Sequence, residues 1–81
     1  METRVAVAAV IVEDQASVAS LNDLLHQYSI YIIGRMGIPY KKKNIAVISI
    51  AMDAPNNVIS ALTGKIGRLK GVTVKTAYST F

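Results

Sequence analysis

The apolar positions of this chain change between runs typical of strands and stripes typical of helices. The first helix should be capped by Asp14 and end near Tyr28, because apolar residues between them recur every three or four positions. A second apolar stripe predicts a second helix, with Pro55 in its first turn and its end before Gly71. Runs rich in β-branched residues predict four strands, which we expect over residues 4–12, 30–36, 45–52 and 72–78.

The resulting order is strand, helix, strand, strand, helix, strand. This is the split βαβ pattern, and it predicts an α+β fold of the ferredoxin-like kind. We expect a βαββαβ sandwich whose four-stranded antiparallel sheet has the order 4132, with both helices on one face. The chain has 81 residues and no linker or internal break, so we expect a single domain over residues 1–81.

The first and third strands, which are central in this topology, are apolar on both faces. In the first strand, Val5, Val7, Ala9 and Ile11 alternate with Ala6, Ala8, Val10 and Val12. An antiparallel sheet covered on one side should instead alternate apolar and polar residues. Two helices can cover only one face, so something else must cover the other. We favour a second copy of the chain over a different protein, because closed homo-oligomers are the commonest arrangement.

The predicted assembly is a homo-oligomer, either a dimer or a tetramer. It would form through the sheet face, through the edge strands, or through both. The composition agrees with this expectation, since 52% of the residues are hydrophobic and only 17% are charged. That is more apolar material than so small a core can enclose.

The composition also excludes several kinds of chemistry. Without cysteine there is no disulfide, thiolate metal site or cysteine nucleophile. His26 is the only histidine and suits the last turn of a helix, although a symmetric oligomer could gather several copies around a metal. The hydroxyl and acidic residues form no catalytic pair in this topology. We therefore expect no enzymatic activity, no metal and no cofactor.

The expected location is the cytoplasm. No apolar run approaches the ~20 residues of a membrane span, so we expect no membrane partner. The start, Met1 to Arg4, lacks the basic and small-residue features of a signal peptide.

The whole chain has a net charge of +4, and most of its positively charged residues lie in the second half. Two interpretations of this basic pole stay open: a phosphate or nucleic-acid site, and a solubility device at a sheet edge. We favour the second, and the central strands lack the aromatic residues of an RNA-recognition module. The pole comprises Lys41, Lys42 and Lys43 in the hairpin after the second strand, and Arg68 and Lys70 after the second helix.

The stretch from Tyr31 to Tyr40 is the most individual part of the sequence. Glycine within a strand indicates a bulge or a close backbone approach. Arg35 would present a fork of donors suited to a carboxylate or phosphate, with Tyr31 and Tyr40 as walls. A ligand or partner site and a simple edge bulge with a solvated arginine both remain open. The candidate site residues are Tyr31, Gly34, Arg35, Met36, Gly37 and Tyr40.

Three segments together resemble a small bacterial family of iron-only hydrogenase system regulators. They are Tyr31–Tyr40, Asp53–Arg68 and Gly71–Tyr78. The resemblance implies a ferredoxin-like fold, similar to ACT domains and to the regulatory domain of the nickel-responsive repressor. Both relatives assemble through their sheets and bind small effectors between subunits. A nickel site does not carry over, since the chain has one histidine and no cysteine.

These observations lead to one functional expectation. We expect an ACT-like, non-enzymatic, oligomeric regulatory or sensing module that serves an iron-only hydrogenase system. A small effector would bind at a subunit interface. The alternatives are a nucleic-acid-binding protein that uses the basic pole, which we do not favour, and a purely structural interaction module without a ligand.

Overall fold

The structure is a computed structural model in which residues 2–80 are described. Short 3-10 turns, η1 (Gln15–Ser17), η2 (Ser29–Tyr31) and η3 (Lys41–Lys43), join several of the regular elements. Those elements are β1 (Arg4–Val12), α1 (Val18–Gln27), β2 (Ile32–Tyr40), β3 (Ile45–Ala54), α2 (Asn56–Gly67) and β4 (Val72–Tyr78).

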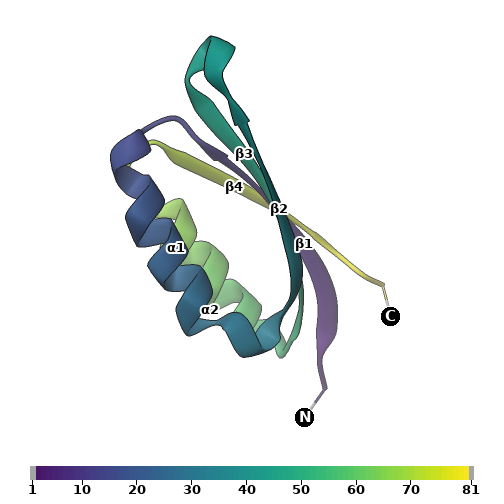
Figure 1. Ribbon diagram of the computed structural model, residues 1–81. Helices are drawn as coiled ribbons and strands as arrows, with labels where there is room; N and C mark the ends of the chain where they lie inside the picture. The colour runs from purple at the N-terminus through teal and green to yellow at the C-terminus, as the bar shows by residue number, and fades with distance from the viewer. Residues whose placement is uncertain (1, 81) are drawn as a thin grey trace.

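The four strands form one antiparallel sheet in the order β2-β3-β1-β4. This is the predicted order read from the opposite edge. Both helices cover the same face of the sheet, and the other face is bare (Figure 1). The predicted α+β ferredoxin-like fold is therefore confirmed.

The predicted bounds of β1 and β4 are confirmed, whereas the bounds predicted for β2 are wrong at both ends. Ile30 lies in η2 rather than in the strand, because the backbone N–H of Tyr31 bonds to the carbonyl of Tyr28 at 3.0 Å and continues the turn. At its other end β2 runs on through Gly37 and Pro39 to Tyr40. Since β2 is an edge strand, the missing N–H of Pro39 is tolerated there.

The bounds of α2 and β3 also differ slightly from the prediction. β3 continues to Ala54, which pairs with Arg4 at the start of β1. Pro55 is consequently the N-cap of α2 rather than part of its first turn, and its carbonyl accepts from the N–H of Val58 at 2.9 Å.

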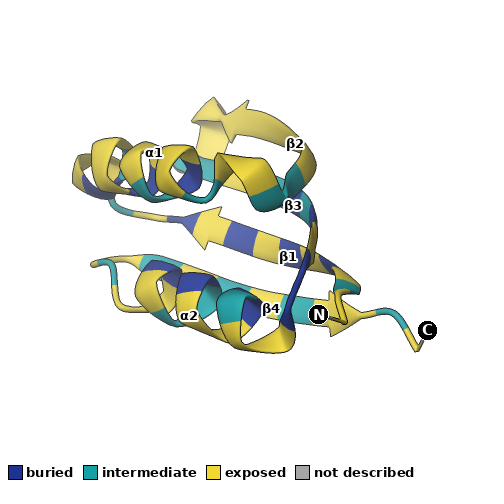
Figure 2. Cartoon of the chain, turned by 90° about the horizontal axis from the view of Figure 1, so that it is seen from below, coloured by how far each residue is buried: buried dark blue, intermediate teal, exposed yellow. Residues whose placement is uncertain are grey.

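The core lies between the sheet and the two helices. Every second residue of the central strands faces the helices and is buried, so the burial of β1 alternates along its length (Figure 2). Four helical side chains, Leu21, Ile59, Leu62 and Ile66, are at most 1% exposed. The strand residues of this core are Ala6, Ala8, Val10 and Val12 from β1, and Ile48, Ile50, Met52 and Ala54 from β3.

The junctions β1–α1 and α2–β4 meet at one end of the molecule. The Asp14 carboxylate accepts a hydrogen bond from Ala16 N at 2.9 Å and so caps η1, the turn that leads into α1. The Glu13 N–H donates to the carbonyl of Gly71 at 2.7 Å, and the Ser17 hydroxyl donates to the carbonyl of Lys70. Gly71 has a φ of 70°, the left-handed region that favours glycine.

Candidate functional site

The bare side of the sheet forms an apolar surface, which we call the open face. Its central members from β1 are 40–43% exposed although they are aliphatic. On the edge strand β2 the exposure of Met36 reaches 65%. The large apolar residues of the open face are Val5, Val7 and Ile11 from β1, Val47 from β3, and Met36, Ile38 and Tyr40 from β2.

A change of register in β2 decides which of its residues join the open face. Ile32 pairs with Met52 and Gly34 with Ala51, so Ile33 is an extra residue in the ladder. The irregularity that the glycines predict is thus confirmed. A Cβ built on Gly34 would meet nothing within 4 Å, which excludes close backbone approach as the reason for this glycine.

The register change decides that Arg35 faces the helices and Met36 the open face. Arg35 is opposite the buried Ile50, so its side chain lies on the side of the helices. Met36 is opposite Ser49 and belongs to the open face. One extra residue reverses the facing of all that follow, because side chains alternate along a strand.

Arg35 forms one wall of a pocket between β2 and α1, which we call the edge pocket. Its guanidinium Nη2 donates to the side-chain oxygen of Asn22 at 3.1 Å. The pocket has a volume of about 340 Å³. Its lining residues are Asn22, Leu25, His26, Ser29, Ile32 and Arg35.

The lining of the edge pocket includes the charged side chain of Arg35 and no acidic residue. In the described part of the chain the only ion pair lies away from this pocket, where the β1–α1 and α2–β4 junctions meet. It joins Lys70 Nζ and Asp14 Oδ2 at 4.0 Å. Arg35 therefore faces the pocket with a neutral amide as its hydrogen-bond partner and without a carboxylate.

The other predicted site residues lie apart from Arg35. The ring centroids of Tyr31 and Tyr28 are 6.5 Å apart, and both side chains pack against the core. Tyr40 lies at the far end of β2 on the open face. Gly37 is opposite Ile48, beyond Arg35 along the strand. The two tyrosines are therefore not walls of the edge pocket.

Sequence reasoning missed the residues that complete the edge pocket. Asn22, His26 and Ser29 lie in or directly after α1 at a spacing of four and then three residues. That spacing places polar residues on one side of a helix. This polar stripe was the available signal, and it lies on the flank of α1 that faces β2.

The basic pole is more dispersed than the topology suggests. Lys41, Lys42 and Lys43 form η3 at the tip of the β2–β3 hairpin, and Lys70 lies near Asp14. The Arg68 side chain turns back along α2, so that its Nη1 would lie 3.5 Å from a Cβ on Gly64.

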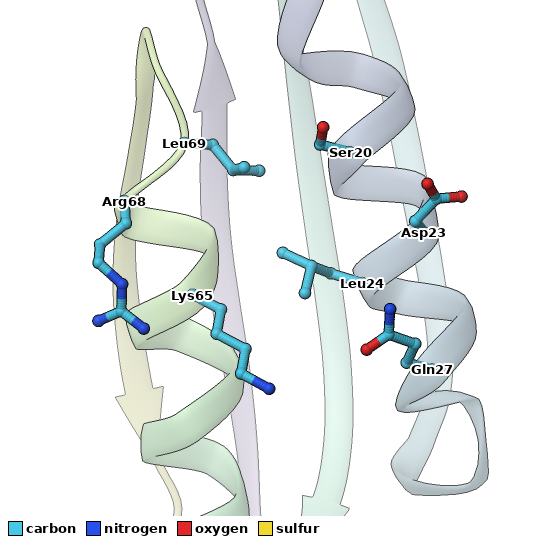
Figure 3. A pocket seen from close by; sticks show the side chains of 7 residues that line it. All are labelled: Ser20, Asp23, Leu24, Gln27, Lys65, Arg68 and Leu69. Carbon is cyan, nitrogen blue, oxygen red and sulfur yellow. The ribbon is translucent and has the colours of Figure 1, made fainter.

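Arg68 instead lines a groove between the two helices, with a volume of about 320 Å³ (Figure 3). Asp23 and Gln27 lie on the α1 side of this groove, whereas Lys65 and Arg68 lie on the α2 side. Lys65 Nζ also donates to the Tyr28 hydroxyl at 3.0 Å. Lys65 and Arg68 outnumber Asp23, so the groove is net positive, but unlike a purely basic site it also contains a carboxylate.

The described residues, 2–80, form neither a metal-binding cluster nor a membrane-spanning helix. These residues contain no group of three or more histidine, cysteine, aspartate or glutamate side chains placed to hold a metal ion. Neither α-helix is long and apolar enough to cross a membrane.

The fold and the bare sheet face define a small ferredoxin-like α+β protein, and comparison with known proteins identifies its family. The sequence model of the TM1266-like family matches residues 4–76. The description of this family reads "Iron-only hydrogenase system regulator, putative". The chain therefore belongs to the TM1266-like family, as the resemblance predicts. A comparison with curated proteins finds no match.

Solved structures agree with this assignment. The chain is similar to the uncharacterized protein TM1266 from Thermotoga maritima, with a TM-score of 0.91 and 35% sequence identity over 95% of this chain and 98% of that one. A formyltetrahydrofolate deformylase from Pseudomonas putida KT2440 is similar with a TM-score of 0.64. Its identity is 8%, over 90% of this chain and 28% of that one, so this second likeness concerns the fold alone.

Proposed function

We propose that this chain is a non-enzymatic regulatory module that works as a homo-oligomer joined through the open face. It serves an iron-only hydrogenase system and binds a small effector at a subunit interface. The observation that carries the proposal is the open face itself, an apolar surface over β1, β2 and β3 on the side of the sheet that neither helix covers. Two charged residues share this side: Asp53 opposite Val5, and Lys75 on β4. The regulatory role is supported by the description of the family.

The size of the open face is consistent with a contact between copies. Three neighbouring strands about 4.8 Å apart, over about seven residues of about 3.3 Å each, give a projected area of roughly 300 Å². Continuous apolar patches of this size on small proteins are often functional. A standard interface buries about 800 Å² per partner, so additional contacts along a sheet edge would strengthen the assembly.

The sheet has two edge strands, β2 and β4, and we propose that β2 offers those additional contacts. β2 pairs with β3 on one side only, so its other side is open to a strand of a second copy. The edge pocket lies beside this strand, between β2 and α1. A copy paired along β2 would therefore lie next to the edge pocket, which supports an effector site at a subunit interface.

The self-association is tested by sedimentation velocity with two matched substitutions. Val7 lies within the open face and is 40% exposed, whereas Ile30 lies in η2 outside this face and is 85% exposed. We expect wild type and Ile30→Lys to be oligomeric, and Val7→Lys to be a monomer. Both variants add one positive charge, so a general effect of charge would change both alike.

Folding is checked by circular dichroism, and a second variant protects the test from misfolding. Ile11→Lys alters another position of the open face, 41% exposed, and should also be monomeric. A wild-type chain that stays monomeric throughout the micromolar range would contradict the proposed assembly.

A further inference from the structure

We propose that the edge pocket binds a small oxyanion, either a carboxylate or a phosphate group, with Arg35 as its anchor. The inference rests on the proposed function, because it assigns a chemical class and a place to the effector of that function.

The bulge in β2 sets the orientation of Arg35. With regular pairing from Ile32 onwards, Arg35 would point to the open face, and the extra residue Ile33 turns it to the side of α1. Bulges are known to redirect a side chain next to a functional site. The turn also keeps a charge away from the apolar open face, where it would oppose self-association.

Arg35 is held by a hydrogen bond that leaves most of its donors available. A guanidinium has five N–H donors in a planar fork, and Asn22 accepts from Nη2 at 3.1 Å. Asn22 thereby orients the group without neutralising it. The remaining donors are available for the two oxygens of a carboxylate or phosphate, which the fork can bind bidentately.

A ligand anion at Arg35 would meet no competing carboxylate in the lining of the edge pocket. Asp23 faces the groove between the helices, where Lys65 and Arg68 lie opposite, and Asp14 lies near Lys70. No acidic side chain lines the edge pocket. The groove between the helices contains Asp23, and a hollow beside the hairpin tip contains Lys41 but no arginine. The edge pocket combines an arginine with a lining free of acids.

The remaining lining residues set the character of the ligand. Ser29 and His26 add hydrogen-bonding groups, while Leu25 and Ile32 give an apolar wall. The volume of about 340 Å³ is at the low end for small-molecule sites, which run from about 300 to 1,000 Å³. A short organic acid or a small phosphate compound therefore suits the pocket better than a nucleotide.

Arg35 must supply most of the attraction for an anion. The pocket lies along the second half of α1, and the carbonyl end of a helix carries partial negative charge. Replacement of the guanidinium should therefore remove binding rather than only weaken it slightly.

The test is a titration followed by ¹H–¹⁵N NMR, with sodium phosphate and sodium succinate added separately at constant ionic strength. We expect saturable shifts of the backbone amides of Asn22, Ser29 and Arg35. Saturation by phosphate, by succinate or by both supports the proposal and identifies which source of the oxyanion the pocket prefers. Shifts that centre on Lys41–Lys43 instead would overturn it.

Three variants separate recognition by the fork from simple attraction by charge. Arg35→Gln and Arg35→Lys should each lose at least about tenfold in affinity, because lysine keeps the charge but not the planar fork. Arg68→Gln removes a positive charge outside the pocket and should bind like wild type. Equal affinity of wild type and Arg35→Gln would refute the assignment.

Sedimentation of the same samples distinguishes this proposal from the assembly on which it rests. Arg35→Gln should remain oligomeric, since Arg35 is not part of the open face. A monomer that still titrates through Arg35 would retain the oxyanion site and refute the assembly. An oligomer that shows no saturable shifts would support the assembly and refute the oxyanion site.

Discussion

Substitution of Gly71 tests the contact between the β1–α1 junction and the α2–β4 junction. Its φ of 70° lies in the left-handed region, and a Cβ added there would lie 2.6 Å from Asp14 Cβ and 2.9 Å from Asp14 N. The clash is with backbone rather than with the end of a flexible side chain. Gly71→Ala must therefore displace Asp14 or the turn itself.

The expected destabilisation has two parts. An L-residue in the left-handed region costs about 1–2 kcal/mol, partly offset by about 0.4–1 kcal/mol from the lower entropy of the unfolded alanine chain. Displacement of Asp14 also weakens the 2.7 Å bond between Glu13 N–H and the Gly71 carbonyl, worth about 1 kcal/mol, and disturbs the contacts of Asp14. The free energy of unfolding should fall by about 1–2.6 kcal/mol in total.

The assay is urea denaturation of wild type, Gly71→Ala and the control Gly34→Ala, all at one protein concentration because assembly contributes to stability. Gly34 lies in a strand, and a Cβ there meets nothing within 4 Å, so Gly34→Ala should change the free energy by less than about 1 kcal/mol. If Gly71→Ala were as stable as wild type, the close approach of Gly71 to Asp14 would be refuted.

Two further predictions concern α2 and the hairpin tip. Gly64→Ala should stabilise the chain by about 0.5–1 kcal/mol in the same assay, because alanine favours a helix and its Cβ would meet only Arg68 Nη1, at 3.5 Å. A loss of stability would contradict this. Replacement of Lys41, Lys42 and Lys43 by alanine should leave the oligomeric state unchanged. The wild-type chain should bind duplex DNA only weakly at physiological salt, as measured by fluorescence anisotropy. Tight DNA binding that the triple variant abolishes would favour the nucleic-acid alternative instead.

The periodicity of the chain was sufficient to predict the order of the elements. β1 and β4 begin and end at the predicted residues, because their apolar runs are bounded by charged residues or by turn residues such as Gly71. β2 was harder to bound, since glycine and proline usually end a strand. At the edge of this sheet the partner strand β3 extends along Gly37 and Pro39, and pairing overrides their local preference.

The candidate site was only partly accessible from the sequence. Arg35 stands out because glycines flank it, but its partners come from α1, thirteen residues earlier in the chain for Asn22. Arg68 was assigned to the basic pole from its position at the end of α2, whereas its side chain extends back over Gly64. Neither contact follows from local sequence, because each depends on how an element is placed or on the rotamer of a long side chain.

By itself, the sequence determined the split βαβ topology and the presence of two apolar faces on strands that have helices for only one. Both follow from composition and period, which are local properties of the chain. Only the tertiary structure decided which face meets the helices, and that Arg35 lies beside α1 while Met36 joins the open face. That choice depends on a single extra residue in the pairing of β2 with β3, and the register between strands is a property of the folded sheet.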